Sequence, residues 1–226
     1  MNEWTDTKGK TLGDYERPSV AVDVAVLTYS GGALQVLVVE HRRRGLALPG
    51  TFLHEGELLT DAAERALRTK AGLVGTQFHQ LAMFDDLARD DRGWVLSMAH
   101  TAVVPAAELP ANAILVNVVG GTVEQELAFD HADMVRLAVK DLRTRYAAQV
   151  DPAGLLGESF TVLELRQLYE VIFDRELQKD AFRRHVTGAL ESTGEMSNPG
   201  NGRPAEMFRR KGGGRLPAQA SVLLTG

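Results

Sequence analysis

The first long apolar run of the chain falls at residues 19–29 (SVAVDVAVLTY), where β-branched residues dominate. Such a run is typical of a strand that is buried on both faces. Ser30, Gly31 and Gly32 then favour a turn, and residues 33–40 (ALQVLVVE) repeat the apolar pattern. The two runs predict a β-hairpin of core strands. Asp23 interrupts the first run, and we interpret it as a satisfied structural carboxylate, with a place at the mouth of a pocket as the alternative.

A strand end, a loop and a helix are predicted between residues 48 and 73 (LPGTFLHEGELLTDAAERALRTKAGL). Thr60 is a suitable N-cap, and the alanines and leucine of residues 62–67 are strong helix formers. Gly72 stands where a glycine that ends a helix is expected. We place the ligand site on this segment.

Further strands and a helix follow up to residue 148. Residues 94–104 and 113–121 have strand patterns, and a polar loop lies at residues 85–93. A helix is predicted to begin at Glu126 and to run to about Ala148. His131 is interpreted as a capping or packing residue, because no activated nucleophile accompanies it.

A second module begins after the turn signal of residues 151–154 (DPAG). Residues 161–173 have a helical period, and Thr161 with Glu164 forms a capping-box pattern. A second helix is predicted at residues 179–190, with Phe182, Val186 and Leu190 facing inward. Residues 196–202, rich in Asn, Pro and Gly, then predict the turn of a β-hairpin that continues to Arg210.

Helix, turn, basic helix and basic hairpin together predict a winged helix-turn-helix that binds double-stranded DNA. Between residues 179 and 215 there are eight basic residues against four acidic ones, on a chain with a net charge of −5. The expected DNA contacts are Lys179, Arg183, Arg184, Arg203, Arg209, Arg210 and Lys211. A helical appendage for dimerisation or for RNA contact is the alternative.

Composition excludes several classes of protein. There is no cysteine, which rules out disulfides, zinc–thiolate sites and cysteine catalysis. No run of eighteen apolar residues exists, and the polar N-terminal segment has no signal core, so we expect a cytoplasmic protein without membrane contact. We divide the chain into a flexible arm (1–17), a ligand domain (18–150), a DNA-binding domain (151–211) and a flexible tail (212–226).

The segment at residues 48–73 resembles the Nudix box, the signature of enzymes that hydrolyse nucleoside diphosphates linked to another moiety. The positions that match its spacing are Glu57, Arg65, Leu67, Gly72 and Leu73. Thr51 replaces the first glycine of the pattern, and Ala66, Thr69 and Lys70 replace its three helical glutamates. The resemblance implies an α/β fold, a Nudix α/β/α sandwich.

The replaced glutamates change the expected chemistry. Positions 66, 69 and 70 share one helix face by their spacing, and in the enzymes this face carries the carboxylates that hold Mg²⁺. Here that face offers a methyl group, a hydroxyl and an ammonium, which repels a divalent cation. We therefore predict a domain that binds its ligand without a metal, without catalytic residues and without cleavage.

Arginines before the box are expected to contact a pyrophosphate, because guanidinium groups bind phosphate oxygens in pairs. The loop at residues 85–93 resembles that of Nudix-type ADP-ribose binders, which use it in the site or in a dimer interface. The expected ligand-binding residues are Arg42, Arg43, Arg44, Glu57, Arg65, Lys70, Asp86 and Arg89. For the arginines at residues 42–44, a solvated connection between strands is the equal alternative.

A Nudix domain with a broken box, followed by a winged helix, resembles the NrtR family of Nudix-related transcriptional regulators of NAD metabolism. The resemblance covers residues 18–211. It implies a homodimeric repressor of genes for NAD biosynthesis or salvage, whose effector is ADP-ribose or an NAD-related nucleotide and which needs no cofactor. Two other classes stay open: a hydrolase with a reorganised metal site at Glu55, Glu57 and Glu64, and a module whose basic surface binds RNA or protein.

Overall fold

A mixed β-sheet forms the centre of the N-terminal domain in the computed structural model, which describes residues 4–197, 204–217 and 224. β1 (Ser19–Ser30) and β2 (Ala33–His41) are antiparallel and form the predicted hairpin. Gly31 and Gly32 turn the chain between them with φ angles of 60° and 79°. Side chains other than glycine rarely adopt such angles, which explains the glycine pair.

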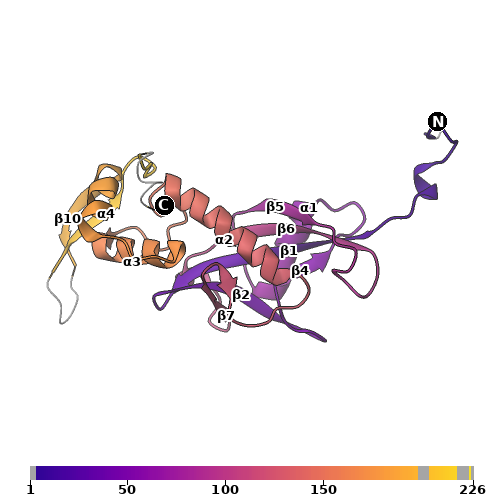
Figure 1. Cartoon of the computed structure of the whole chain (residues 1–226), viewed down its shortest axis with the longest axis horizontal. Helices are drawn as coiled ribbons and strands as arrows, with labels where there is room; N and C mark the ends of the chain where they lie inside the picture. Colours follow the sequence, from indigo (N-terminus) through magenta and orange to yellow (C-terminus); the bar gives the residue numbers. More distant parts are fainter. Residues whose placement is uncertain (1–3, 198–203, 218–223, 225–226) are drawn as a thin grey trace.

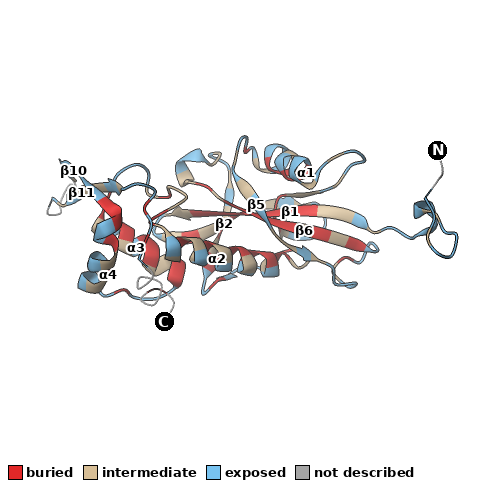
Figure 2. Ribbon diagram, turned by 90° about the horizontal axis from the view of Figure 1, so that it is seen from above, coloured by how far each residue is buried: buried red, intermediate tan, exposed pale blue. Residues whose placement is uncertain are grey.

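The strand order of the sheet is β5-β6-β1-β2-β7-β8. The flanking strands are β5 (Phe78–Phe84), β6 (Val95–Val103), β7 (Ile114–Val119) and β8 (Thr122–Val123). β1 runs parallel to β6, and short strands β3 (Gly45–Ala47) and β4 (Gly50–Phe52) add to β2 and β1. Helix α1 (Leu59–Ala66) lies on one face of the sheet and α2 (His131–Ala148) on the other (Figure 2). This arrangement confirms the predicted α/β/α sandwich.

The alternation of side chains along β1 explains its uninterrupted apolar run. Val22, Val24 and Val26 pack on the face that α1 covers, whereas Ala25 and Leu27 pack on the face that α2 covers. Successive strand residues point to opposite faces, so a strand between two helices is apolar at nearly every position.

Both helices of this domain begin at residues other than the predicted ones. α1 has Leu58 as N-cap instead of Thr60, and the Asp61 carboxylate accepts the Leu58 N–H at 3.0 Å. A π-helical turn, Leu67–Ala71, extends α1 to Gly72, whose φ of 67° ends the helix as predicted. α2 begins at His131, five residues after the predicted start.

Tertiary contacts account for the late start of α2. Ala128 donates its N–H to the carbonyl of Leu46 at 2.7 Å, so residues 126–128 lie along β3. Phe129 has a φ of 57°, outside the helical region, and therefore blocks helix formation before His131.

The C-terminal module has the predicted helix, helix and hairpin. α3 (Val162–Phe173) carries the predicted capping box: the Thr161 hydroxyl accepts the Glu164 N–H at 3.2 Å, and the Glu164 carboxylate accepts the Thr161 N–H at 2.7 Å. α4 (Lys179–Val186) follows, and β10 (Leu190–Met196) pairs with β11 (Glu206–Arg210) as the wing. β11 also pairs with β9 (Phe160–Thr161).

The second helix is shorter than predicted. It ends at Val186, a 3-10 turn occupies Thr187–Ala189, and Leu190 is buried as the first residue of β10. Gly188 lies in this turn, and glycine in a helix costs about 1 kcal/mol relative to alanine. Leu190 reaches the core from a strand instead of from the helix.

Helix α2 belongs to both domains. Its N-terminal half covers the sheet, and its C-terminal half packs on α3, as Figure 1 shows. Arg143 donates from Nε to the carbonyl of Ile172 at 2.7 Å, and the rings of Tyr146 and Tyr169 lie 5.7 Å apart. One continuous hydrophobic core therefore runs from β1 through α2 into the winged helix.

A buried carboxylate holds the junction between the domains. Asp151 is fully buried, and its side chain accepts hydrogen bonds from the Tyr146 hydroxyl at 2.8 Å and from the Leu155 and Leu156 N–H groups at 2.8 and 3.0 Å. Arg210 from the wing completes this set, at 2.6 Å from Nη2 to Oδ2. Burial, with the nearby Asp151 charge, holds the pKa of Tyr146 well above its ordinary value, so Tyr146 stays a hydrogen-bond donor.

Two predictions near the C-terminus need correction. Arg210 was expected at DNA phosphates, but its guanidinium binds Asp151 and lies 5.3 Å from the Phe160 ring, inside the junction. Part of the predicted loose tail is also ordered against α2, because Leu216 is buried and donates its N–H to Ala148 at 2.9 Å. Residues 218–223, 225 and 226 of the tail lie outside the described residues.

The junction can be tested by replacing Arg210 with methionine. This change leaves the buried Asp151 carboxylate without its cation, which costs about 3 kcal/mol for a broken buried pair. Arg209→Met on the same strand breaks an exposed pair with Glu191 and is the matched control, expected to change stability little. Urea unfolding measures both, and equal losses for the two variants would contradict a structural role of the Asp151–Arg210 pair.

Candidate ligand cleft and nucleic-acid interface

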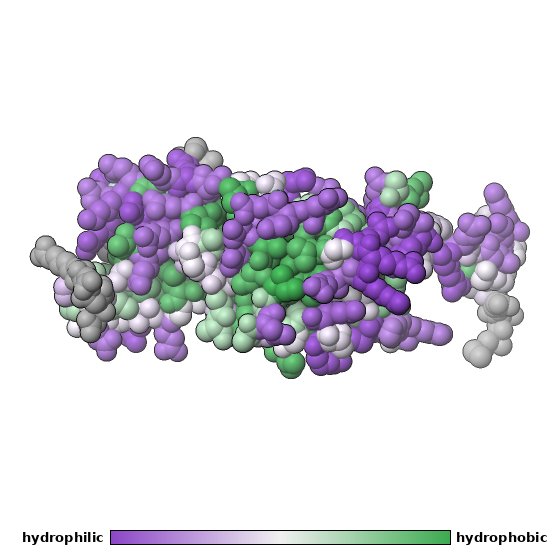
Figure 3. Space-filling model, turned by 90° about the horizontal axis from the view of Figure 1, so that it is seen from below, coloured by the Kyte–Doolittle hydropathy of each residue, from purple (hydrophilic) through white to green (hydrophobic). Residues whose placement is uncertain are grey.

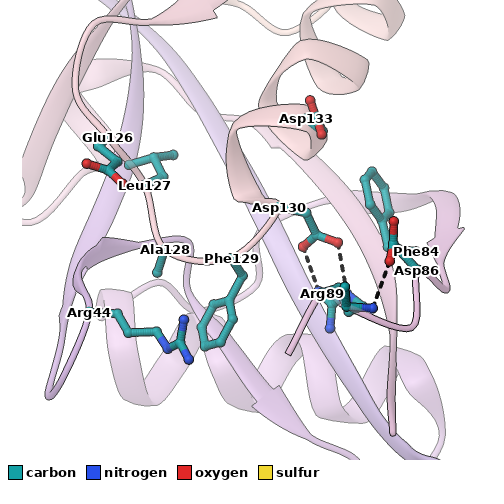
Figure 4. A pocket seen from close by; sticks show the side chains of 11 residues that line it. Arg44, Phe84, Asp86, Arg89, Glu126, Leu127, Ala128, Phe129, Asp130 and Asp133 are labelled. Carbon is teal, nitrogen blue, oxygen red and sulfur yellow. Dashed lines mark hydrogen bonds and ion pairs between the residues drawn. The ribbon is translucent and has the colours of Figure 1, made fainter. Parts of the chain in front are cut away.

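Three adjoining cavities form a cleft at the end of the sheet where β1 begins and β2 ends. The first has a volume of about 710 Å³ and opens between the β5–β6 loop and the start of α2 (Figure 4). The second, of about 260 Å³, lies over β4 and the π-helical turn that follows α1. The third, of about 560 Å³, lies along residues 41–44. Arg89 and Phe129 line both of the first two.

Phe129 is the aromatic centre of this cleft. The guanidinium carbons of Arg44 and Arg92 lie 4.7 and 5.3 Å from its ring centre, and the His41 ring meets it edge-on at 5.5 Å. A φ of 57° costs energy in a phenylalanine, and such backbone strain gathers at functional sites. Two cations beside one aromatic ring suit a ligand with both a flat base and phosphates.

Phe129, His41 and Arg92 line the cleft but are not among the ligand residues predicted from the sequence. The run Leu-Ala-Phe-Asp-His at residues 127–131 was the available signal, because it places an aromatic residue just before a helix start. The approach of Arg44 to Phe129 joins residues 85 positions apart and depends on the folded chain.

Asp23 forms the floor of the cleft. Its carboxylate accepts a hydrogen bond from the Ser97 hydroxyl at 2.6 Å and lies 3.4 Å from Nε2 of His131. Burial by itself raises the pKa of Asp23, but the His131 and Ser97 hydrogen bonds and the Arg89 charge outweigh it, so the pKa lies below its ordinary value. Asp23 is therefore an ionised, satisfied carboxylate that also lines the cleft.

His131 and Gly50 fix the backbone around this floor. The Nδ1 atom of His131 accepts the Leu48 N–H at 2.9 Å, which leaves Nε2 to carry the proton toward Asp23. His131 is thus the packing histidine that the sequence predicts. A Cβ atom at Gly50 would lie 1.9 Å from Oδ1 of Asp23, so this position requires glycine.

Arg89 and Asp86 both line the first cavity, and their contact with a ligand stays a prediction. The Arg89 side chain is 4% exposed and makes two hydrogen bonds to Asp130, at 2.8 and 2.7 Å, which join the β5–β6 loop to the start of α2 (Figure 4). Asp86 accepts the Ala88 N–H at 2.7 Å and so shapes the same loop. The β5–β6 loop is therefore tied directly to the residue that precedes the first turn of α2.

Glu57 and Arg65 bind each other instead of facing the cleft, which corrects their predicted place. Arg65 donates to both carboxylate oxygens of Glu57 at 2.8 Å and also, at 2.8 Å each, to the Thr51 hydroxyl and the Phe52 carbonyl. The Arg65 hydrogen bonds, with the His54 N–H, lower the pKa of Glu57 to about 2. This pair closes the loop of the box and leaves few atoms for a ligand.

The three positions that replace the box glutamates do not share one environment. Ala66 is buried in α1, whereas Thr69 and Lys70 are exposed in the π-helical turn, and Thr69 donates to the Arg65 carbonyl at 2.7 Å. Lys70 alone of the three lines the second cavity. It adds a positive charge where the enzymes place carboxylates.

Arg42 and Arg43 are exposed, and both line the third cavity. Arg44 lines the first and third cavities and forms an ion pair with Asp91. The predicted residues that line the first two cavities, which share Arg89 and Phe129, are therefore Arg44, Lys70, Asp86 and Arg89.

Within the described ranges, no group of three or more histidines, cysteines, aspartates or glutamates is arranged to hold a metal ion. In the same parts of the chain, no helix is long and apolar enough to cross a membrane.

The exposed face of α4 is basic. Lys179, Arg183 and Arg184 are exposed, while Phe182 and Val186 are buried against the rest of the module. A groove of about 380 Å³ between α3, α4 and the wing is lined by Lys179 and Arg183, among others. The predicted contacts on α4 therefore face solvent together.

The wing contributes fewer free cations than predicted. Arg209 forms an exposed ion pair with Glu191 at 3.1 Å, and Lys211 is exposed at the end of β11. Arg210 is held in the junction, and Arg203 lies outside the described residues.

Comparisons with known proteins agree with this architecture. A family model described as the NrtR DNA-binding winged helix domain matches residues 152–210. The ADPR responsive transcriptional repressor NtrR of Acinetobacter baylyi is 33% identical, over 87% of this chain and 83% of the relative. The chain belongs to the NrtR family.

The solved structures that are similar to this NrtR-family chain include a complex with DNA. NrtR of Shewanella oneidensis, complexed with a 27mer DNA, matches with a TM-score of 0.71 and 26% identity, over 91% of this chain and 97% of that one. A MutT/nudix family protein from Enterococcus faecalis matches with a TM-score of 0.71 and 24% identity, over 89% and 90% of the two chains. The second match shows the fold alone.

The Glu57–Arg65 pair predicts a dependence of stability on pH. Folding lowers the pKa of Glu57 from 4.5 to about 2, so the pair stabilises the fold above pH 4.5 and this contribution is lost as the pH falls towards 2. The free energy of unfolding should therefore differ between the natural chain and Glu57→Gln at pH 6, and the difference should shrink at pH 3. Glu55→Gln in the same exposed loop is the control, and a difference that does not vary with pH would contradict the assignment.

Proposed function

We propose that this protein is a transcriptional repressor that binds operator DNA through α4 and the wing and responds to ADP-ribose or a related NAD metabolite. The main support for the proposal is the continuous hydrophobic core through α2. This core joins the domain that holds the arginine-lined cleft to a winged helix with a basic exposed face. Membership of the NrtR family and the ADPR response of the Acinetobacter baylyi relative support it. Its targets are genes of NAD biosynthesis or salvage, and it acts in the cytoplasm.

The chemistry of the cleft favours a nucleotide with a pyrophosphate. Arg44, Lys70 and Arg92 supply three cations around the second and third cavities. Phe129 supplies a flat apolar surface between the first two cavities, where a base or sugar can pack. Protein cations therefore take over the neutralisation of phosphate charge that a metal provides in the hydrolases.

Helix α2 connects the ligand cleft to the DNA-binding module. Its 18 residues span about 27 Å at 1.5 Å per residue. Asp130, just before its first turn, holds Arg89 in the cleft, and Tyr146 in its last turn holds Asp151, which binds Arg210 of the wing. A ligand that binds better to one position of α2 shifts the population of wing orientations, and by linkage DNA shifts the affinity for the ligand.

We propose that the working unit is a homodimer. The Shewanella oneidensis relative was solved with a 27mer DNA, which is about 90 Å long at about 3.4 Å per base pair. Two half-sites one helical turn apart need only about 34–36 Å between their centres. A duplex of this length has room for the winged helices of two copies.

The DNA interface can be tested with Arg183→Ala. Because each copy of the proposed homodimer loses one phosphate contact, operator affinity should fall by at least tenfold and the slope of log K against log salt should become shallower by about 2. Fluorescence anisotropy with the upstream promoter DNA at several salt concentrations measures both quantities. Arg136→Ala, which removes an exposed arginine of α2 outside the module, is the control and should bind like the natural chain.

An Arg183→Ala variant that binds every duplex as the natural chain does would contradict the assigned interface. Binding to RNA in preference to duplex DNA would favour the RNA-binding alternative.

The ligand site can be tested with Phe129→Ala. Removal of the ring should weaken ADP-ribose binding by about tenfold or more, because stacking on an aromatic side chain is worth about 1–3 kcal/mol. Calorimetric titration measures this loss, and operator binding without ligand should remain, since Phe129 precedes the first residue of α2 and the winged helix packs at the other end of that helix. Leu87→Ala, which removes an 81% exposed leucine of the β5–β6 loop that does not line the cavity, is the control. An unchanged ADP-ribose affinity in Phe129→Ala would place the ligand elsewhere.

The same samples decide between binding and cleavage. With Mg²⁺ and ADP-ribose present, we expect no release of AMP, because Ala66, Thr69 and Lys70 occupy the positions of the metal-holding glutamates. Chromatographic detection of AMP at a rate above that without protein would favour the hydrolase alternative with Glu55, Glu57 and Glu64.

A further inference from the structure

Residues 4–17 form an arm with a structure of its own. The Asp6 carboxylate accepts the N–H groups of Lys8 and Lys10 at 2.8 and 2.9 Å and the hydroxyl of Tyr15. A 3-10 turn, Leu12–Asp14, follows, in which the Asp14 carboxylate accepts the Thr11 N–H at 2.7 Å. Local hydrogen bonds of this kind give the arm a defined shape.

The arm extends away from the rest of its chain (Figure 1). Among the described residues, every hydrogen bond and ring contact of residues 4–17 joins two residues of the arm itself. Its base is fixed, because Ser19 donates its N–H to the Trp94 carbonyl at 3.0 Å as β1 begins. The arm therefore leaves the sheet beside the cleft without covering any surface of its own molecule.

The arm exposes large apolar side chains. Trp4, Leu12 and Tyr15 are 58%, 65% and 45% exposed. The arm is neutral over residues 4–17, with three acidic and three basic residues. Apolar groups held on a shaped segment are typical of a contact with another molecule.

An uncharged edge of the sheet offers a matching surface. Residues 109–123 contain no charged residue, and Ile114 and Val119 of β7 are 41% and 55% exposed. In the described chain, β8 pairs only with Val118 and Val119, so β7 has no strand beside its first residues. Figure 3, seen from below, the side on which β7 lies in Figure 1, shows a hydrophobic area over the middle of the N-terminal domain.

We propose that the arm of one copy docks on the β7 edge of a second copy, and that the second arm docks in return. Proteins usually protect an open apolar edge strand with charges, prolines or a covering segment. Here each chain has an open edge at the start of β7 and, among the described residues, an arm that contacts nothing in its own molecule, so two copies can exchange arms about a two-fold axis. The inference rests on the dimer of the proposed function and assigns its interface.

The absence of cysteine in the natural chain allows a direct test. A Leu12→Cys protein is mixed with an Ile114→Cys protein under mild oxidation, and the products are separated without reductant. A covalent pair of the two different chains is expected. Val74→Cys, an 80% exposed position on neither surface, replaces Ile114→Cys in the control and should give at least tenfold less of the mixed pair. Equal yields with both partners would overturn the proposal.

The second measurement is the molar mass in solution of the full chain and of a chain that starts at Pro18. The full chain should be a dimer, and the shortened chain should dissociate at concentrations at least tenfold higher than the full chain does. Its circular dichroism and melting are expected to stay unchanged, because the arm contacts no core residue. A dimer that survives truncation unchanged overturns the arm exchange and leaves the dimer of the proposed function standing, whereas a monomeric full chain overturns both.

Discussion

The burial of α2 on two sides is the constraint on which the rest of the fold depends. Met134, Val135 and Ala138 of this helix complete the core of the sheet, and Tyr146 completes the core of the winged helix. Because one helix completes both cores, the position of α2 on the sheet sets how the winged helix lies relative to the N-terminal domain. The buried Asp151 follows within three residues of its end and recruits Arg210 from the wing, so the DNA-binding hairpin is tied to the same helix.

The cleft keeps the Nudix scaffold while its charge is changed. Glu57 and Arg65 close the box loop, because the Arg65 guanidinium makes four hydrogen bonds to Glu57, Thr51 and Phe52. Around them, Lys70 and the arginines near Phe129 are the cations that the proposed function assigns to the phosphates of the ligand. The buried Asp23 remains ionised because its donors outweigh its burial.

Features set by neighbours in the chain were predictable. The β1–β2 hairpin follows from two glycines between apolar runs, and the Thr161–Glu164 capping box follows from a three-residue spacing. The helix end at Gly72 follows from the ease with which glycine adopts the left-handed conformation. The predicted start of α2 was five residues too early, because the pairing of residues 126–128 with β3 overrides their local helix propensity. The predicted end of α4 was wrong because a buried leucine fits both a helix and a strand. The apolar pattern at Leu190 therefore does not distinguish the end of a helix from the start of a strand.

The sequence by itself determined the order of the modules, the altered box and the basic face of α4, since these depend on residue type and spacing. Only the tertiary structure decided which charges are free. Arg210 and Asp151 are 59 residues apart, Arg89 and Asp130 are 41 apart, and both pairs are made by the folded chain. An arginine in a sequence can bind phosphate or a buried carboxylate with the same guanidinium, and the position of the nearest anion, which only folding fixes, chooses between them.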